Sequence, residues 1–113
     1  MHELSLAESV IQIIEEAAVA QQFTKVRAVW IEVGSMAGVE QDAMRFCFDA
    51  VARDTLAEGA RLEMIEVPGT GSCTDCGSVH PVANLLDTCP KCGSVAVQVE
   101  GGAGLRVKEL DVV

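Results

Sequence analysis

The sequence predicts an α/β (α+β) fold in which two helices pack on a small three-stranded sheet, interrupted by an inserted four-cysteine module. Helix-like and strand-like segments alternate from residue 4 to residue 67. Two Cys-x-x-Cys pairs follow, flanked by glycine-rich stretches at 68–71 and 101–104. The last segment, 105–113, is strand-like but too short to fold alone, so we expect it to return to the earlier strands.

Residues 4–23 are predicted to form an amphipathic helix, because their apolar residues recur at helical spacing and their acidic residues take the other face. The motif Ser5-x-x-Glu8 fits a capping box, in which the serine accepts from a backbone N–H and the glutamate reaches back. This motif predicts a helix start near Ser5. The residues before it are then expected to lie outside the helix.

Segment 25–33 is predicted to be a strand with apolar residues on both faces, and this pattern favours a central position in a sheet. Segment 40–56 is predicted to be the second helix, with Glu40 in the first turn, where the helix dipole favours acidic side chains. Cys47 lies in its apolar stripe and has no histidine or cysteine at ligand spacing, so we expect a core thiol. Segment 61–67 alternates as a second strand.

The expected organisation is an α/β domain of residues 1–68 plus 101–113, with residues 69–100 as the inserted module. The glycine-rich stretches are expected to act as hinges between them.

The composition excludes several partners. Half of the residues are hydrophobic, enough for a core, and the formal net charge is −9. A chain this acidic lacks the basic surface that binds nucleic acid or an anionic membrane. The first twenty residues carry four glutamates and no Lys or Arg, so no signal peptide is expected and the cytoplasm is the expected compartment.

The inserted module carries a candidate metal site formed by Cys73, Cys76, Cys89 and Cys92. Four converging thiolates suit tetrahedral Zn²⁺ in a structural, closed site, the ligand pattern of a zinc ribbon. Iron in a rubredoxin-like site is the alternative, but residues 69–100 contain no Phe, Trp or Tyr to surround a redox centre. A pair of disulfides is the other alternative, and a reducing compartment disfavours it.

His80 lies four residues after Cys76, near enough in sequence to be an alternative zinc ligand. The competing interpretation is a histidine that only neighbours the ligands or faces solvent.

Met1, His2 and Glu3 form a second candidate metal site. A terminal amine, the first amide nitrogens and the His2 imidazole can close fused five- and six-membered chelate rings around one ion. Such an all-nitrogen set favours the square-planar ions Ni(II) and Cu(II). The alternative is an ordinary frayed terminus.

No catalytic constellation is visible. The chain has two histidines, no Ser/His/Asp arrangement and no lysine-bearing phosphate loop, so an enzyme is not expected.

Taken together, these segments resemble the HypA/HybF family of hydrogenase maturation nickel metallochaperones. The resemblance covers essentially the whole chain. It rests on the opening Met-His-Glu-Leu-Ser-Leu, Ile-Glu-Val-Gly at 31–34, Val-Glu at 39–40, Glu-Gly-Ala at 58–60, and the four cysteines.

The resemblance implies nickel at Met1, His2 and Glu3, with the acidic Glu40 near it, and a structural zinc on the four cysteines. It also implies delivery of nickel to the large subunit of [NiFe]-hydrogenase together with a nickel-binding GTPase, and some relatives also serve urease. The sequence does not set the oligomeric state and leaves a homodimer open. Two other functions remain as alternatives: a zinc-ribbon protein-interaction module without nickel, and a rubredoxin-like electron carrier.

Overall fold

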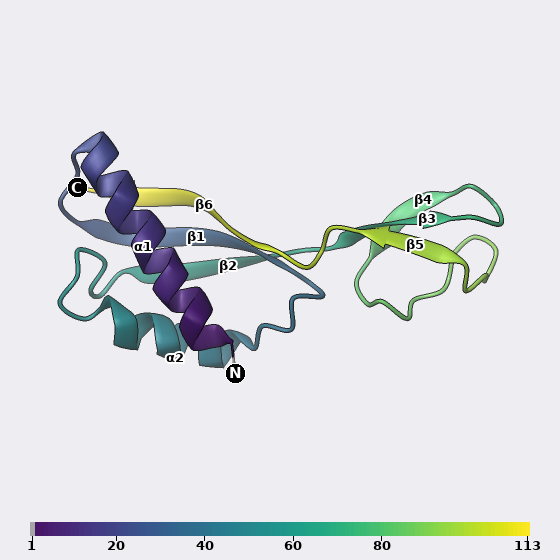
Figure 1. The fold of residues 1–113 in the computed structure, drawn as a ribbon, viewed down its shortest axis with the longest axis horizontal. Coiled ribbons are helices and arrows are strands. Elements are labelled where there is room, and N and C mark those ends of the chain that lie inside the picture. The colour runs from purple at the N-terminus through teal and green to yellow at the C-terminus, as the bar shows by residue number, and fades with distance from the viewer. Residues whose placement is uncertain (1) are drawn as a thin grey trace. The chain divides into compact units, whose positions relative to one another are not determined.

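The structure, a computed structural model, describes residues 2–113 (Figure 1). Two helices and six strands follow one another along this part of the chain: α1 (Glu3–Gln21), β1 (Val26–Gly34), α2 (Gln41–Ala52), β2 (Arg61–Val67), β3 (Gly69–Cys73), β4 (Val79–Val82), β5 (Val97–Glu100) and β6 (Leu105–Val112). Neither described helix is long and apolar enough to cross a membrane.

The first sheet has the strand order β2-β1-β6, so β1 is central, as its two apolar faces predict. The last strand returns antiparallel to β1. Near one end Val113 N–H donates to the Lys25 carbonyl at 2.8 Å, and at the other Gly34 N–H donates to the Gly104 carbonyl at 2.8 Å. The predicted fold class, two helices on a three-stranded sheet with a separate cysteine-bearing module, is confirmed.

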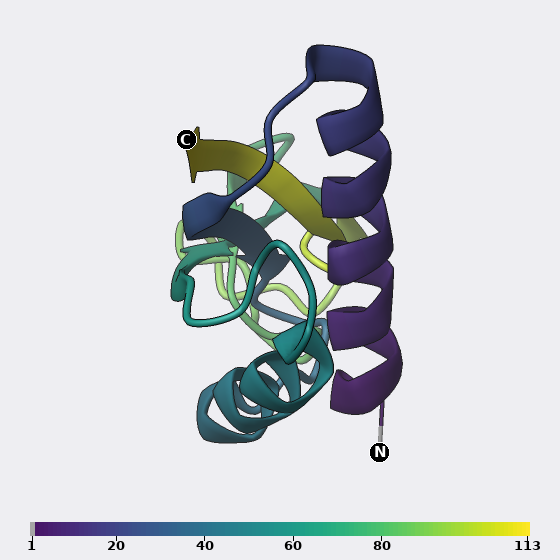
Figure 2. The same ribbon diagram turned by 90° about the vertical axis from the view of Figure 1, so that its left-hand side faces the viewer.

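The core lies where the helices meet the first sheet. Figure 2 shows α1 along one side of the strands, and α1 and α2 contact each other. Both helices bury an apolar face at helical spacing, as predicted, but Ile13, which the spacing places in the stripe of the first helix, is 45% exposed. Their buried apolar residues include Ala7, Val10, Ile11 and Ile14 of α1, and Met44, Cys47 and Phe48 of α2.

The predicted start of the first helix is wrong. The helix begins at Glu3 with His2 as its N-cap, and the Leu6 N–H donates to the His2 carbonyl at 3.0 Å. Ser5 is already inside the helix, where its carbonyl accepts from the Ser9 hydroxyl at 3.0 Å. The earlier start has a tertiary cause, because the Glu3 side chain is buried and hydrogen-bonded to a residue far along the chain.

The second helix also differs from its prediction, since it ends at Ala52 rather than near residue 56. A turn follows, in which Asp54 has a φ of 62° and the Thr55 hydroxyl donates to the Ala52 carbonyl at 2.6 Å. That hydroxyl satisfies one of the carbonyls a helix end leaves unpaired.

The chain folds into two compact units. One contains residues 1–32, 39–65 and 106–113, and the other, here called the cysteine unit, contains 33–38 and 66–105. The segment 33–38 thus groups with the cysteines, whereas the sequence-based division places it in the α/β domain. Backbone hydrogen bonds within the cysteine unit account for this: Ser35 N–H donates to the Val67 carbonyl at 2.8 Å, and Met36 N–H to the Gly102 carbonyl at 2.7 Å.

Two glycines allow close backbone packing inside the cysteine unit. A Cβ on Gly34 would lie 2.2 Å from the Gly102 carbonyl carbon, and one on Gly102, whose φ is +75°, would lie 2.7 Å from the Gly69 nitrogen. No larger residue fits without displacing backbone.

The second sheet, inside the cysteine unit, has the order β4-β3-β5 with antiparallel pairing throughout. Gly71 of β3 lies opposite His80 of β4 and Val99 of β5. This sheet leads directly into the first cysteine pair, because Cys73 is the last residue of β3.

Candidate metal centres

The structure brings the sulfur atoms of all four predicted cysteines together. The Sγ atoms of Cys73, Cys76, Cys89 and Cys92 lie within 4.8 Å of one another. The Cys73–Cys92 sulfur distance is 3.6 Å and the Cys76–Cys89 distance is 3.7 Å. Tetrahedral Zn²⁺ with Zn–S bonds of about 2.3 Å requires sulfurs about 3.8 Å apart, so the four sulfurs fit such an ion. A disulfide needs sulfurs about 2.05 Å apart, and all four cysteines are free thiols.

The two Cys-x-x-Cys segments form the same local turn. In the first, Gly77 N–H donates to the Cys73 carbonyl at 2.9 Å, and in the second, Gly93 N–H donates to the Cys89 carbonyl at 2.8 Å. Both glycines have a φ of +75°, which a residue with a Cβ rarely adopts. The glycine after each pair therefore curls the backbone so that both sulfurs of a pair face the same point.

Ser78 is a residue of this site that the sequence analysis missed. Its hydroxyl shares hydrogen bonds with Cys76 Sγ at 3.1 Å and with Cys89 Sγ at 3.3 Å, which links the two cysteine pairs. This hydroxyl lowers the pKa of both thiols, that of Cys89 to about 5. Cys76 and Cys89 therefore ionise more readily than an ordinary thiol. Against the lowering effect of the Ser94 backbone N–H, hydrogen bonding to the Cys73 thiol and burial raise the pKa of Cys92 to about 12, so a metal that binds Cys92 must displace a proton.

A signal for Ser78 is present in the sequence. The tripeptide Cys-Gly-Ser ends both cysteine pairs, at 76–78 and at 92–94. In the second copy the Ser94 hydroxyl hydrogen-bonds the Asp75 carboxylate and accepts from the Ala96 N–H at 3.0 Å, so the two serines serve different partners.

His80 does not belong to the group of four sulfurs. His80 lies on β4 opposite Gly71 of β3. A Cβ added at Gly71 would lie 2.9 Å from the His80 Nε2 atom. Both of its ring nitrogens are buried and have no hydrogen-bond partner among the described residues.

At the other candidate site, Met1 lies outside the described residues, His2 is the N-cap of α1 and Glu3 is its first residue. The His2 side chain is 48% exposed, and its Nδ1 lies 3.7 Å from Glu3 Oε2. Glu3 itself is only 6% exposed. Its Oε2 accepts a hydrogen bond from the Glu40 backbone N–H at 3.2 Å. The predicted neighbours His2, Glu3 and Glu40 are therefore brought together at the starts of the two helices.

The Glu40 side chain is the N-cap of α2. Its Oε1 accepts from the Asp42 N–H at 3.1 Å and its Oε2 from the Ala43 N–H at 2.7 Å. The Glu40 N–H, and next the backbone N–H of Glu3 itself, hold the pKa of Glu3 below its usual value, against the opposing effect of burial. Glu3 is thus a carboxylate at neutral pH.

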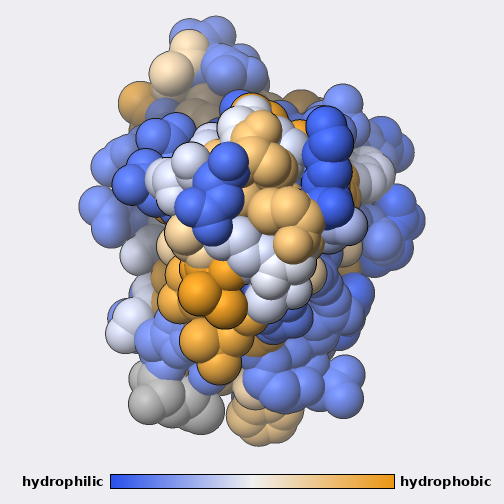
Figure 3. Space-filling view, turned by 90° about the vertical axis from the view of Figure 1, so that its right-hand side faces the viewer, coloured by the Kyte–Doolittle hydropathy of each residue, from blue (hydrophilic) through white to orange (hydrophobic). Residues whose placement is uncertain are grey.

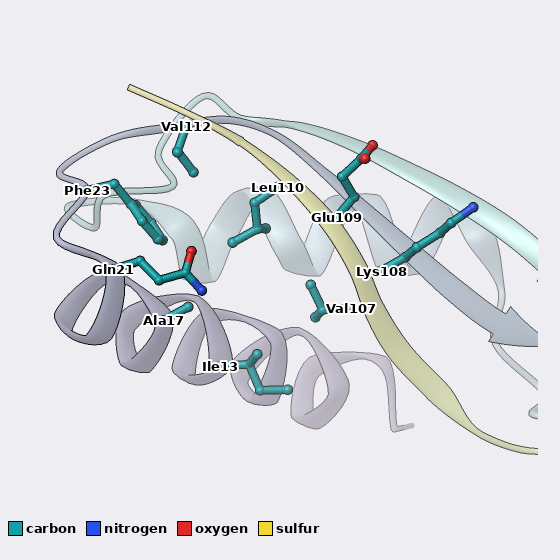
Figure 4. A pocket seen from close by; sticks show the side chains of 9 residues that line it. All are labelled: Ile13, Ala17, Gln21, Phe23, Val107, Lys108, Glu109, Leu110 and Val112. Atoms are coloured by element: carbon teal, nitrogen blue, oxygen red, sulfur yellow. The ribbon is translucent and has the colours of Figure 1, made fainter.

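A pocket of about 320 Å³ lies between α1 and β6 (Figure 4). Apolar side chains such as Ile13, Phe23 and Leu110 form most of its wall, and Lys108 and Glu109 are its charged lining residues. It carries no histidine, cysteine or carboxylate pair and so suggests no chemistry of its own.

Known proteins resemble this chain over nearly its whole length. Residues 1–112 match the family described as "Hydrogenase/urease nickel incorporation, metallochaperone, hypA". Hydrogenase maturation factor HypA of Azotobacter vinelandii is 53% identical, and that of Albidiferax ferrireducens 54%, each over 99% of both chains. The solution structure of the Ni metallochaperone HypA from Helicobacter pylori has a TM-score of 0.72 at 27% identity, covering 100% of this chain and 98% of that one.

Proposed function

The chain belongs to the HypA family of hydrogenase and urease nickel-incorporation metallochaperones, and from that premise we propose that it binds Ni(II) at its N-terminus and delivers it to a [NiFe]-hydrogenase. The observation that carries the proposal is the position of His2. It is the N-cap of α1, with a side chain that is 48% exposed and reachable by an incoming ion or a partner.

The proposed nickel ligands are nitrogens of Met1, His2 and Glu3. The terminal amine, the His2 amide and the His2 imidazole close two fused chelate rings, and this nitrogen set suits square-planar Ni(II). Such a site is selective, yet it lies at the protein surface, where a partner can capture the ion. A carrier of this kind binds and releases its cargo without changing it chemically, so we propose no enzymatic activity.

Zinc is the proposed resident ion of the four cysteines. Four protein ligands leave no position for a substrate, so zinc there would cross-link the two Cys-x-x-Cys turns and stabilise the cysteine unit. We assign the nickel function to the α/β domain, 1–68 plus 101–113, and the zinc function to residues 69–100. His80 remains a candidate alternative ligand if a thiolate is displaced.

The proposed partners are a nickel-binding GTPase of hydrogenase maturation and the hydrogenase large subunit, with a homodimer as a candidate assembly. The cytoplasm is the proposed compartment, which suits four free thiols. The cysteine unit also exposes large apolar side chains, which supports a role in binding another protein. These residues are Val79, Leu85, Leu86 and Val95. In the view of Figure 3, apolar side chains (orange) gather among hydrophilic ones.

The test is a nickel titration of untagged protein beside two altered forms, His2→Ala and a form acetylated at the Met1 amine. Each change removes one chelating nitrogen, so both should weaken Ni(II) binding by at least about tenfold, or about 1.4 kcal/mol. If both altered forms bind as tightly as the native chain, the N-terminal site is wrong. Metal analysis and a visible spectrum separate zinc, which is colourless, from a coloured rubredoxin-like iron site.

A further inference from the structure

We infer that the Glu3 side chain has a positioning role in nickel capture, separate from any bond between the Glu3 main-chain nitrogen and the ion: its carboxylate holds the start of α1 against the start of α2 through the backbone N–H of Glu40. The Glu40 carboxylate is then a helix cap and not a nickel ligand. This inference rests on the proposed nickel function and specifies how its site is built.

The first step concerns the burial of Glu3. Glu3 has 6% of its surface exposed, and among the described residues it is the acidic residue that is buried. It is also the third residue of the sequence. A carboxylate is rarely buried unless it is paired or hydrogen-bonded. Its Oε2 meets the Glu40 N–H at 3.2 Å, across 37 positions of sequence. The contact therefore ties the first turn of one helix to the residue that begins the other.

The second step concerns the oxygens of Glu40. Both accept backbone N–H groups of the first turn of α2, at 3.1 Å and 2.7 Å. A metal at this carboxylate would compete with those hydrogen bonds and leave the donors of the first turn unpaired. Glu40 contributes to the site through its main chain, while its side chain keeps α2 capped.

The third step concerns His2. Its carbonyl accepts the Leu6 N–H at 3.0 Å and closes the first turn of α1. Its Nδ1, the nitrogen that closes the six-membered chelate ring, lies 3.7 Å from Glu3 Oε2. Since Glu3 is anchored, the His2 amide and imidazole belong to an ordered helical turn. An ordered site loses less conformational freedom on binding than a frayed terminus would.

Matched substitutions separate a positioning role from direct ligation. Glu3→Gln keeps an oxygen that accepts the Glu40 N–H and removes the charge, whereas Glu3→Ala removes both. Glu40→Gln weakens the cap but keeps the backbone N–H that Glu3 needs. Zinc content and thermal melting establish that each variant is folded before nickel is added.

The experiment combines Ni(II) titration of the untagged, zinc-loaded proteins with hydrogen exchange at the Glu40 amide without nickel. We expect Glu3→Gln and Glu40→Gln to bind Ni(II) with an affinity within about threefold of that of the native protein. Glu3→Ala should bind about tenfold more weakly, because one or two side chains must then lose conformational freedom when the ion binds. The Glu40 amide should exchange slowly in the native protein and in Glu3→Gln, and faster in Glu3→Ala.

Three results would overturn the inference. If Glu3→Gln and Glu3→Ala weaken Ni(II) binding equally, the carboxylate binds the ion directly or acts through its charge. Unchanged affinity in Glu3→Ala, despite faster Glu40 exchange, would leave Glu3 a purely structural role. Weakening in Glu40→Gln as large as in His2→Ala would make Glu40 a ligand. If the native protein itself fails to bind nickel, the proposed function falls and this inference with it, a result distinct from the other three.

Discussion

The carboxylate of Glu3 accepts a hydrogen bond from the backbone N–H of Glu40 at 3.2 Å, and so joins the beginnings of α1 and α2. It also places the His2 imidazole beside a fixed negative charge. The four clustered cysteines lie in a different unit of the chain. A hydrogen bond between the two helices stabilises one unit, and the cysteine cluster is the candidate stabilising feature of the other. Separate substitutions can therefore test the two features.

The Glu3 contact predicts a pH dependence of stability. The pKa of Glu3 is lowered in the folded protein from its usual 4.5, so between the two values the unfolded chain binds more protons and stability rises with pH. The stabilisation is complete above the usual value and disappears as pH falls through the folded one. The difference in melting temperature between native protein and Glu3→Gln should therefore shrink progressively as the pH is lowered below 4.5. Glu8→Gln, which removes an exposed charge of the same helix, is the control and should show no comparable trend.

Ser78 is predicted to set the pH at which the cysteine cluster releases zinc. Its hydroxyl lowers the pKa of Cys76 and Cys89, so Ser78→Ala should raise both and let protons compete with the metal at higher pH. The pH midpoint of zinc release, followed with a chromogenic chelator, should move upward. Ser94→Ala removes a hydroxyl that hydrogen-bonds Asp75 and Ala96 instead of these thiols, and should move the midpoint less. Equal shifts in the two variants would contradict a direct effect of Ser78 on the thiols.

The two metal sites are predicted to differ in their effect on stability. Cys89→Ser should lower the free energy of unfolding by about 3 kcal/mol or more, because loss of a ligand removes metal binding that is coupled to folding. His2→Ala changes a half-exposed side chain and should cost about 0.5 kcal/mol or less. Thermal melting of both variants with zinc present measures the difference. Comparable melting temperatures would refute the division into a structural and a transferred metal.

Gly102 and Gly101 provide a matched pair for backbone packing inside the cysteine unit. Both have positive φ, +75° and +73°, but only at Gly102 would a Cβ meet other atoms, the nearest being the Met36 methyl at 2.5 Å and the Gly69 nitrogen at 2.7 Å. Gly101→Ala should lower the free energy of unfolding by about 1–2 kcal/mol, because alanine is strained in this backbone conformation. Gly102→Ala should cost about 1–3 kcal/mol more, because the neighbouring backbone must move. Denaturant midpoints measure both, and equal costs would mean that the backbone around Gly102 is loose enough to accommodate a methyl group.

Local patterns predicted much of this protein. Helical periodicity located the two buried helix faces that contain Ile14 of α1 and Phe48 of α2, and the apolar faces of residues 25–33 placed β1 at the centre of its sheet. Capping patterns were less reliable. Ser5-x-x-Glu8 fits a helix start, yet the helix begins at Glu3 because a tertiary hydrogen bond holds that residue in place. A local sequence motif carries no information about a hydrogen-bond partner 37 positions away.

The α/β fold class and the four-cysteine cluster could be predicted from the sequence, because periodicity and Cys-x-x-Cys spacing act over a few residues and need no distant partner. The family followed from the resemblance of its motifs, which the family match confirms. Only the tertiary structure decided that Glu3 is buried against the Glu40 N–H, that Ser78 joins the two cysteine pairs, and that segment 33–38 belongs with the cysteines. Each of these depends on a hydrogen bond or close backbone contact between residues far apart in sequence, and such contacts exist only once the chain has folded.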